Sequence, residues 1–372
     1  MIADIAPLEA LDSTSCRRTA TGVRPASAPL SSLERLPTWA ICVPLALHWL
    51  WWALRYRSLT LPTVANPGIT AGGLVGEGKT DYFRAMGAGC HAATAPWCVL
   101  EHSTQLSDTE LQAMLDAHDL SFPLVVKPDL GMCGHGVRKV KSLAELSSYL
   151  ARFPADVAVV VQAYLAARGE AGIFYARSRL EATGRVIGIA LRSFPKVIGD
   201  GHRTLAELID GNARVCRVRS ASHAPDFDPA YIPAAGEEVR LSLIGSTRVG
   251  GLYEDGARLL TPRLAATIDA MAQDIAGFHF GRFDVRYETE DDLAQGSFTI
   301  MEVNGAGSEA IEAWDPRFSL WQAFTLILRK QRLLFRISAE NRAAGARPIG
   351  ITMLIRYFVR QRRLLRQYPP SS

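Results

Sequence analysis

The sequence lacks paired cysteines, low-complexity blocks and an internal repeat. Its six cysteines are scattered, and no two of them are spaced C-x-x-C. This pattern argues against a zinc ribbon or a disulfide scaffold, so we expect reduced thiols in the cytoplasm. Charged residues make up only 21% of the chain and hydrophobic residues 48%, which excludes a mostly disordered protein. Without low-complexity blocks or an internal repeat, the 372 residues predict a globular protein of two or three domains.

The N-terminal region also lacks the basic start of a secretory signal. Residues 1–15 hold three acids and no Lys or Arg, and Ser, Thr, Ala and Pro dominate residues 19–32. We therefore expect residues 1–38 to form a flexible arm outside the fold.

One apolar stretch stands out, from Trp39 to Leu54, and it contains four of the seven tryptophans. As a helix it would span about 24 Å, which is short of the ~30 Å hydrocarbon core of a bilayer. Pro44 and His48 count further against a spanning helix. The alternatives are a helix buried on the protein body and a helix in the membrane interface, where Trp and the following Arg55 suit the headgroup region.

Charge is distributed unevenly, although the net charge is only +4. Residues 326–372 contain eleven Lys and Arg residues and a single acid, Glu340. A basic tail of this kind fits an anionic partner such as a membrane surface or nucleic acid. The other interpretation is a solvated helix packed on the body.

From residue 107 onward, helical and strand patterns alternate. Ser107 and Glu110 form a predicted capping box for a helix that ends near His118. Further helices are expected at residues 143–153, 205–210 and 262–278. Strands are expected at residues 122–127, 157–164, 173–175, 186–192, 283–287 and 297–303, the last two as a pair. This alternation predicts an α/β or α+β enzyme fold.

Residues 73–80 match the G-x-x-x-x-G-K-[ST] pattern of a phosphate-binding loop. The context does not favour that loop, because no clear hydrophobic strand precedes Gly73 and no suitable strand ending in Asp follows. The glycines still suit a close backbone approach to a ligand. Lys79 is then either a contact to substrate or phosphate or a solvated loop lysine.

A lysine beside a glycine-rich turn is the first feature of a nucleotide site. Lys127 ends a predicted buried strand, and the turn after it contains Gly131, Gly134 and Gly136. An ammonium group beside glycine amides suits phosphates. A strand-end lysine that reaches water above a structural hairpin would give the same pattern.

Two further segments add polar groups in the same order along the chain. A buried strand runs into the connector of Gln162, Ala163 and Tyr164, which can pair with an adenine edge, and Glu170 can hold ribose hydroxyls. A later Gly-Asp-Gly turn before a helix gathers basic residues, among them Lys196, and so favours an anion. Alone, each segment is equally well explained as a plain turn.

An acidic cluster completes the set. Strand alternation places Glu302 and Asn304 on one face, and Asp284 lies on a strand that can pair beside them. Carboxylate and amide oxygens next to phosphate are hard ligands that suit Mg²⁺. The alternative is a purely structural ion-pair cluster with Arg282 and Arg286.

Together these motifs resemble the ATP-grasp superfamily of carboxylate–amine ligases. They follow the order of that family over about residues 110–312. Residues 282–284 and 304–308 look like the D-alanine–D-alanine ligase branch, and residues 197–209 are similar to the ligase domain of cyanophycin synthetase. Gln162 stands where the family usually has Glu.

The resemblance implies an α+β fold of the ATP-grasp type, in which two α/β subdomains with antiparallel sheets clasp ATP. It implies an ATP-grasp domain at residues 110–325, divided into a lid subdomain (110–165) and a core subdomain (166–325). Residues 39–109 are then a Trp-rich and Gly-rich N-terminal region with a helical segment, and residues 326–372 a basic helical extension.

The resemblance also implies a reaction. An ATP- and Mg²⁺-dependent ligase would join a carboxylate to an amine through an acyl phosphate, on amino-acid or peptide-like substrates. One or two Mg²⁺ ions, with Mn²⁺ as a substitute, would bind Asp284, Glu302 and Asn304. The implied catalytic residues are Arg282, Lys196 and Ser308, the last in a loop of donors against the acyl phosphate. The implied ATP contacts are Lys127, Gly131, Gly134, Gly136, Gln162, Ala163, Tyr164 and Glu170.

Two other functions stay open at this point. A phosphotransferase of the same fold would stop at a phosphorylated product, and a membrane-associated protein would keep only a nucleotide site. For the ligase we expect small-molecule carboxylate and amine partners, no specific nucleic acid and a homodimer. The expected location is cytoplasmic, with peripheral contact to the inner face of a membrane through the stretch from Trp39 to Leu54 and the basic tail.

Overall fold

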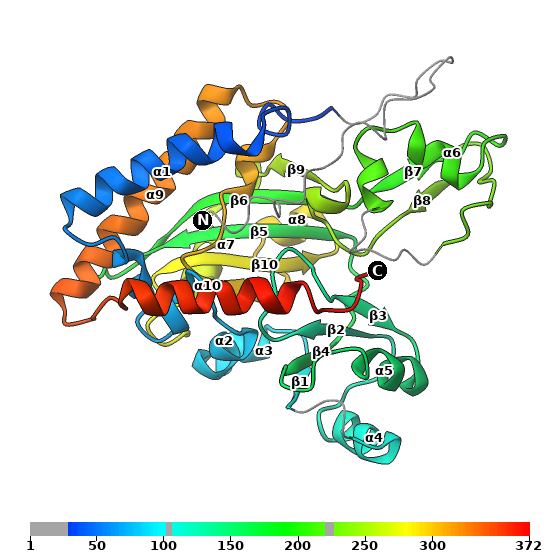
Figure 1. Ribbon diagram of the computed structural model, residues 1–372, viewed down its shortest axis with the longest axis horizontal. Coiled ribbons are helices and arrows are strands. Elements are labelled where there is room, and N and C mark those ends of the chain that lie inside the picture. Colours follow the sequence, from blue (N-terminus) through cyan, green and yellow to red (C-terminus); the bar gives the residue numbers. More distant parts are fainter. Residues whose placement is uncertain (1–28, 102–105, 220–226) are drawn as a thin grey trace.

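The structure combines helices with antiparallel sheets (Figure 1). It is a computed structural model that describes residues 29–101, 106–219 and 227–372, so most of the arm expected at residues 1–38 lies outside the described residues. The largest sheet has five antiparallel strands in the order β11-β10-β5-β6-β9. These strands are β5 (Gly169–Ala176), β6 (Arg185–Ser193), β9 (Leu252–Asp255), β10 (Phe280–Tyr287) and β11 (Thr299–Asn304).

A four-stranded antiparallel sheet, in the order β1-β4-β2-β3, packs against two helices. Its elements are β1 (Trp97–Leu100), α4 (Asp108–Ala117), β2 (Leu124–Pro128), β3 (Arg138–Val140), α5 (Leu143–Leu150) and β4 (Val159–Ala163). Each helix begins after a serine, Ser107 or Ser142, whose hydroxyl accepts a hydrogen bond from the backbone three residues on. Because β1 pairs with β4, this unit starts earlier in the chain than residue 110.

A smaller unit is inserted between β6 and β9 and projects beside both sheets (Figure 1). It consists of β7 (Lys196–Ile198), α6 (Leu205–Asp210) and β8 (Glu238–Arg240), and it has its own small apolar core. The carboxylate of Glu34 ties it to the N-terminal segment by accepting hydrogen bonds from Arg214 and Arg217, both at 2.6 Å. The Glu34 side chain is only 2% exposed, so this is a buried ion pair.

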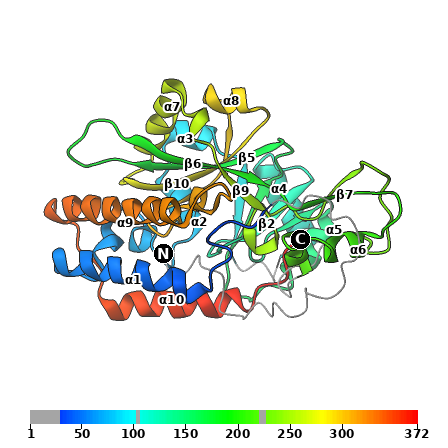
Figure 2. The ribbon, with the colours of Figure 1, turned by 90° about the horizontal axis from the view of Figure 1, so that it is seen from above.

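The two faces of the five-stranded sheet carry different side chains, because successive residues of a strand point to opposite sides. Phe283 and Val285 enter the main core. On that side lie α3 (Ala88–Ala92), α7 (Pro262–Gln273) and α8 (Glu290–Ala294) (Figure 2). Arg282 and Asp284, at the alternate positions of β10, are directed to the other face and line a cavity there.

Long helices cover the second side of the sheet. Figure 2 shows α9 (Leu320–Ala343) against the sheet, with α1 (Thr38–Arg55) and α10 (Ile351–Leu365) farther out. Ile41 and Leu45 of α1 are buried against Ile327 of α9, so the stretch from Trp39 to Leu54 forms a helix with one face on the protein. Within the described ranges, no helix is both long enough and apolar enough to cross a membrane.

Candidate functional site

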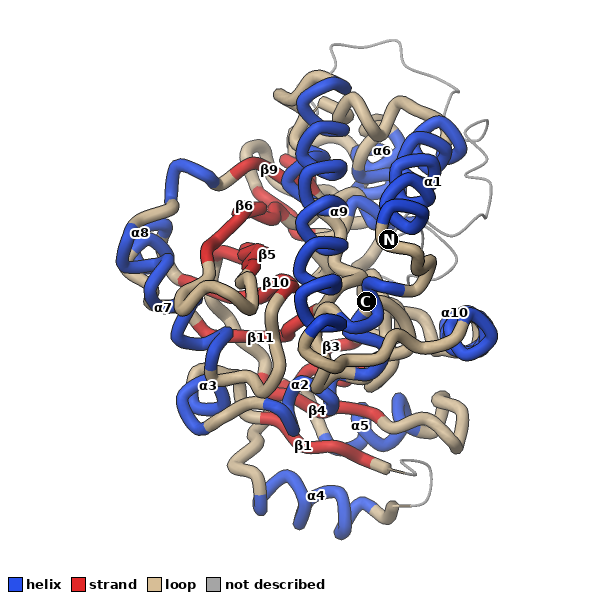
Figure 3. The backbone as a smooth tube through the Cα atoms, turned by 90° about the vertical axis from the view of Figure 1, so that its left-hand side faces the viewer, coloured by secondary structure: helices blue, strands red, loops and turns tan. Residues whose placement is uncertain are grey.

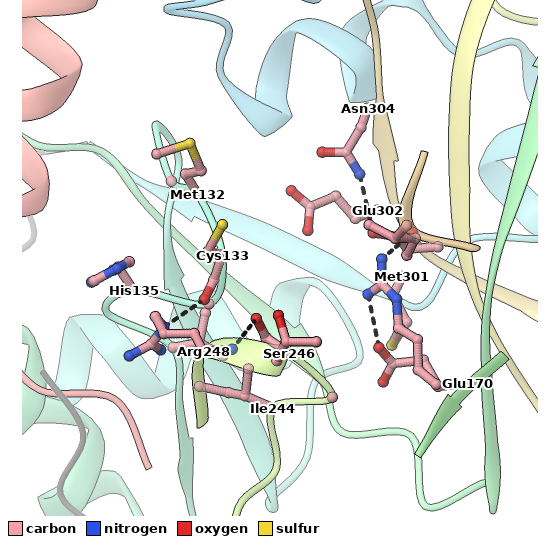
Figure 4. Close-up of a pocket in the computed structure, with 18 of the residues that line it drawn as sticks. Met132, Cys133, His135, Glu170, Ile244, Ser246, Arg248, Met301, Glu302 and Asn304 are labelled. Carbon is pink, nitrogen blue, oxygen red and sulfur yellow. Dashed lines mark hydrogen bonds and ion pairs between the residues drawn. The ribbon is translucent and has the colours of Figure 1, made fainter. Parts of the chain in front are cut away.

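A cavity of about 440 Å³ opens between the four-stranded and five-stranded sheets. Figure 4 shows two facing walls: the turn of Met132, Cys133 and His135 on one side, and Glu302 and Asn304 on the other. Of the fourteen residues predicted from the sequence, twelve line this cavity. They are Lys127, Gly131, Gly134, Gln162, Ala163, Tyr164, Glu170, Arg282, Asp284, Glu302, Asn304 and Ser308.

The acidic cluster is assembled by the pairing of β10 with β11. Asp284 lies opposite Glu302 in the register, and Arg282 lies opposite Asn304. The side-chain amide of Asn304 donates to Oδ2 of Asp284 at 3.1 Å, which leaves the amide oxygen of Asn304 as the acceptor end. The predicted trio therefore does converge on one patch of the cavity wall.

Two arginines hold Asp284 in this structure. Arg192 donates to Oδ1 at 2.9 Å, and Nε of Arg282 donates to the same oxygen at 2.7 Å. Burial by itself raises the pKa of Asp284, but the two guanidinium groups outweigh it and the net pKa is lowered. Asp284 is thus held as a carboxylate in a buried site.

Arg192 is the central residue that the sequence analysis left without a role. It bridges Asp284 and Glu170, with 2.9 Å to each carboxylate. Arg286 pairs with the second oxygen of Glu170 at 3.2 Å. The strand pattern could have indicated this residue, because Arg192 ends the predicted strand 186–192. In the observed register it lies opposite Glu170. Glu170 is therefore fixed by two arginines.

The residues of this patch suit Mg²⁺ in the kind of donor they offer. Asp284, Glu302 and Asn304 supply two carboxylates and one amide oxygen, and Mg²⁺ in nucleotide sites takes one or two carboxylates and completes its shell with phosphate and water. Among the described residues, no three or more His, Cys, Asp or Glu side chains are grouped to hold a metal ion. With only these three donors from the protein, a Mg²⁺ ion at this patch would complete its shell with phosphate and water oxygens.

Lys127 reaches the cavity from the end of β2. Its ammonium group donates to Oε1 of Gln162 at 2.7 Å and to the carbonyl of Met301 at 3.1 Å. Burial, with a further contribution from the charge of Lys79, lowers the pKa of Lys127 to about 8. Gln162 also donates to the carbonyl of Ala95 at 3.1 Å, so both ends of its side chain are engaged within the protein.

Lys79 is a second lysine of the cavity, and it comes from the segment with the phosphate-loop pattern. It begins α2 (Lys79–Ala85), its side chain is 7% exposed, and Nζ lies 3.3 Å from Oε1 of Glu302. Nζ also donates to the carbonyl of Pro128 at 3.1 Å. Burial excludes the solvated loop lysine. No strand occurs in the described chain before Gly73, so the strand–loop–helix of a true phosphate loop is not formed.

The glycine-rich turn forms the opposite wall. Gly134 and Gly136 have φ of +74° and +66°, values that favour glycine, and a Cβ on Gly134 would lie 2.8 Å from Ile244. Nε of Arg248 donates to the carbonyl of Cys133 at 3.1 Å (Figure 4). Gly136, the third predicted glycine, does not line the cavity itself.

The last residues of the chain pack against the same turn. The hydroxyl of Tyr368 donates to the carbonyl of Leu130 at 2.7 Å, and the backbone N–H of Ser372 donates to Val137 at 3.2 Å. Tyr149 of α5 donates to the carbonyl of Pro370 at 3.1 Å. The segment after α10 is therefore joined by hydrogen bonds to both ends of the turn and to helix α5.

Two catalytic expectations differ from the structure. Lys196 lies outside the cavity lining, on β7, and its half-exposed ammonium pairs with Glu238 at 2.7 Å. The reason is that β7 belongs to the inserted unit and pairs with β8 instead of the main sheet.

The second expectation concerns the loop that follows β11. In this loop, the N–H groups of Ala306 and Gly307 donate to the carbonyls of Gly72 and Gly73.

Ser308 lines the cavity, but its hydroxyl is engaged by the protein. Both its backbone N–H and Oγ donate to the carbonyl of Gly305, at 3.0 Å and 2.7 Å. The loop expected to offer donors to an acyl phosphate therefore uses these donors to fix its own shape and its contact with residues 72–73.

Comparison with known proteins gives structural neighbours only. No family model and no curated protein matches the sequence. D-alanine–D-alanine ligase from Bacillus anthracis is similar at 18% identity and a TM-score of 0.41, over 72% of this chain and 69% of that one. The same enzyme complexed with ATP matches at 18% identity and a TM-score of 0.34, over 71% and 65%.

A bifunctional glutathione synthetase from Pasteurella multocida is a third neighbour. It matches at 14% identity and a TM-score of 0.34, over 68% of this chain, which spans only 35% of that larger chain.

Proposed function

We propose that this protein is an ATP- and Mg²⁺-dependent ligase of the ATP-grasp type that joins a carboxylate to an amine through an acyl phosphate. One observation carries the proposal. Two buried lysines, Lys79 and Lys127, share a cavity with the oxygen ligands Asp284, Glu302 and Asn304. Buried cations beside carboxylates under a glycine-rich turn suit a triphosphate better than any uncharged ligand.

The phosphates of ATP would lie between the lysines and the turn of residues 131–136. Lys79 takes the part that the sequence analysis gave to Lys196, because Lys79 is in the cavity and Lys196 is not. The base would lie by Ala163 and Tyr164, where β4 ends. Glu170 would meet ribose hydroxyls from the ion pair that Arg192 and Arg286 already fix.

Asp284, Glu302 and Asn304 would hold Mg²⁺, which would supply neutralisation of phosphate charge when bound. The protein's own work is positioning. Arg282 would neutralise the reacting carboxylate, and Arg192 would keep Asp284 ionised and in place. The glycine-rich turn would keep water from the reactive acyl group.

The test is ATP consumption by the purified protein with Mg²⁺, across pools of amino acids and small peptides, with mass spectrometry of the products. An amide formed together with ADP and phosphate supports the ligase. A phosphorylated product without an amide indicates the phosphotransferase of the same fold. Absence of any nucleotide binding contradicts the site assignment as a whole.

Two variants make this test specific to the cavity. Glu302→Ala removes a proposed metal ligand and is expected to abolish turnover. Glu238→Ala removes a carboxylate of an exposed pair outside the cavity lining and is expected to leave turnover unchanged.

A further inference from the structure

Helix α1 presents an apolar stripe to solvent along its whole length. The exposed fractions are 69% for Trp39, 63% for Leu47, 63% for Trp51 and 77% for Leu54. Val43, Leu50 and these four follow spacings of three or four residues, so they share one helical face. Soluble proteins rarely expose so many large apolar side chains in one continuous row.

Helix α10 adds a second exposed surface of mixed character. Its first turns expose Ile351, Met353, Ile355 and Val359. Arginines are exposed as well, along and after the same helix: Arg356, Arg360, Arg363 and Arg366. Leu364 and Gln361 are the buried residues that attach this helix to the protein.

The two helices lie on the same side of the molecule. Figure 2 places α1 and α10 together on the side away from α7 and α8, and Figure 3 shows both beyond α9. The cavity lies behind these two helices, because Thr38 and the buried Ile41 of α1 and the buried Gln361 of α10 are among its lining residues.

The chain segments that contain α1 and α10 carry positive charge only. Residues 35–76 and 341–372 contain no Asp or Glu and together contain ten arginines. Two copies of this surface would therefore repel each other, which disfavours a dimer through it. A nucleic acid would satisfy the arginines but would leave the Leu, Val and Ile row without a partner.

We propose that the α1–α10 face docks on the surface of an anionic lipid bilayer. The aliphatic row would enter the boundary between headgroups and acyl chains, and the exposed tryptophans would lie at headgroup level. The arginines would pair with anionic headgroups. The helices lie flat on the membrane, and the cavity is then held next to its surface.

The test is cosedimentation of the full-length protein with vesicles, without ATP, so that its outcome is independent of the proposed ligase activity. Vesicles of equal parts phosphatidylcholine and phosphatidylglycerol are compared with pure phosphatidylcholine. The protein is expected to bind the anionic vesicles at least about tenfold more tightly, and added salt is expected to weaken this binding. Quenching of tryptophan fluorescence by brominated lipid is expected on binding.

Variants separate the two halves of the face. Leu47→Glu with Trp51→Glu, and separately Arg356→Glu with Arg360→Glu, are each expected to reduce binding about tenfold or more. Leu180→Glu changes an 84% exposed leucine in the turn between β5 and β6, and is expected to leave binding unchanged. Unaltered thermal melting of each variant excludes unfolding as the cause of a loss.

Three results would overturn the proposal. One is failure to sediment with either vesicle type. Another is equal binding to both vesicle types, since the arginines would then contribute nothing. The third is a concentration-dependent dimer that Trp51→Glu dissociates, which would make this face a contact between copies.

Discussion

The ammonium of Lys79 lies 3.3 Å from the carboxylate of Glu302, although 223 positions (302 − 79) separate the two residues in the sequence. The lysine starts a short helix, and the glutamate lies on β11, an edge strand of the five-stranded sheet that pairs with β10. The contact places a cation beside a proposed metal ligand in the cavity wall. In the proposed function, Lys79 would pair with a phosphate of ATP, and Glu302 would be one of the residues that hold Mg²⁺.

Replacing Lys79 tests which lysine meets the phosphates. Lys79→Gln is expected to weaken ATP binding about tenfold to hundredfold, the range for losing a hydrogen bond to a charged group. Lys196→Gln, which removes an exposed ion pair with Glu238, is the matched control and is expected to change affinity less than about twofold. Calorimetric titration with ATP checks both variants. If Lys196→Gln weakened ATP binding and Lys79→Gln did not, Lys196 would be the phosphate contact, as the sequence predicts.

The lowered pKa of Lys127 predicts that the protein takes up a proton when ATP binds. Its pKa is lowered to about 8 in the protein without ligand, so at pH 8.5 much of it is neutral. Phosphate oxygens favour the charged form, and ATP binding at that pH is therefore expected to take up more than about half a proton. Calorimetry in buffers of different ionisation enthalpy measures this uptake.

Two variants assign the uptake to this lysine. Lys127→Arg keeps the positive charge, and arginine is protonated both before and after ATP binds. The proton uptake is therefore expected to disappear. Gln162→Glu places a carboxylate where Oε1 accepts from Lys127 at 2.7 Å, which is expected to raise the pKa of the lysine and to reduce the uptake. An unchanged uptake in Lys127→Arg would show that another group takes the proton.

The buried ion pair of Glu34 predicts a pH-dependent stability. Burial raises the pKa of Glu34, but Arg214 and Arg217 outweigh it, so the folded-state pKa lies below the ordinary value of 4.5. The pair therefore stabilises the protein above about pH 4.5, and this contribution is lost as the pH falls through the folded-state pKa. Glu34→Gln is expected to cost about 3 kcal/mol at pH 7, and less below pH 4.5.

Urea unfolding followed at pH 7 and at pH 4 checks the Glu34 prediction. The matched control is Glu238→Gln, which breaks an exposed pair and is expected to cost less than about 1 kcal/mol at either pH. Equal losses for the two variants would contradict a stabilising role for the buried pair.

The close packing of Gly134 in the glycine-rich turn predicts that a larger side chain there lowers ATP affinity. Gly134→Ala places a Cβ 2.8 Å from Ile244 at a φ of +74°, so the turn must shift. ATP affinity is expected to fall about tenfold, equivalent to about 1.4 kcal/mol. Gly236→Ala has a similar φ of +84° with nothing within 4 Å, and is expected to leave ATP affinity unchanged. A similar loss in both variants would point to backbone strain and not to the shape of the turn.

Local patterns in the sequence were enough for much of the fold. The capping box at Ser107 is confirmed, and the strands expected at residues 283–287 and 297–303 pair as β10 and β11. These elements depend on neighbours along the chain, so alternation and capping residues specify them. The convergence of Asp284, Glu302 and Asn304 follows from that one pairing.

What sequence patterns could not supply was the contact between distant segments. Lys196 looked like a phosphate ligand because basic residues surround a glycine turn, yet pairing of β7 with β8 carries it away from the cavity. Lys79 acquires its role only when α2 is brought against β11, and Arg192 only when β6 joins the same sheet as β10, with β5 between them. Such contacts depend on the global arrangement of the sheets, which no local period encodes.

The hydrogen bonds from Tyr368 and Ser372 to the glycine-rich turn have a consequence for kinetics. A loop that is mobile before binding loses conformational entropy when a ligand orders it. Here Arg248 and the segment after α10 already order the turn, so a nucleotide meets less of that entropic cost. For the proposed nucleotide, we therefore expect exchange to be slowed when the hydrogen bond from Tyr368 to the carbonyl of Leu130 must break first.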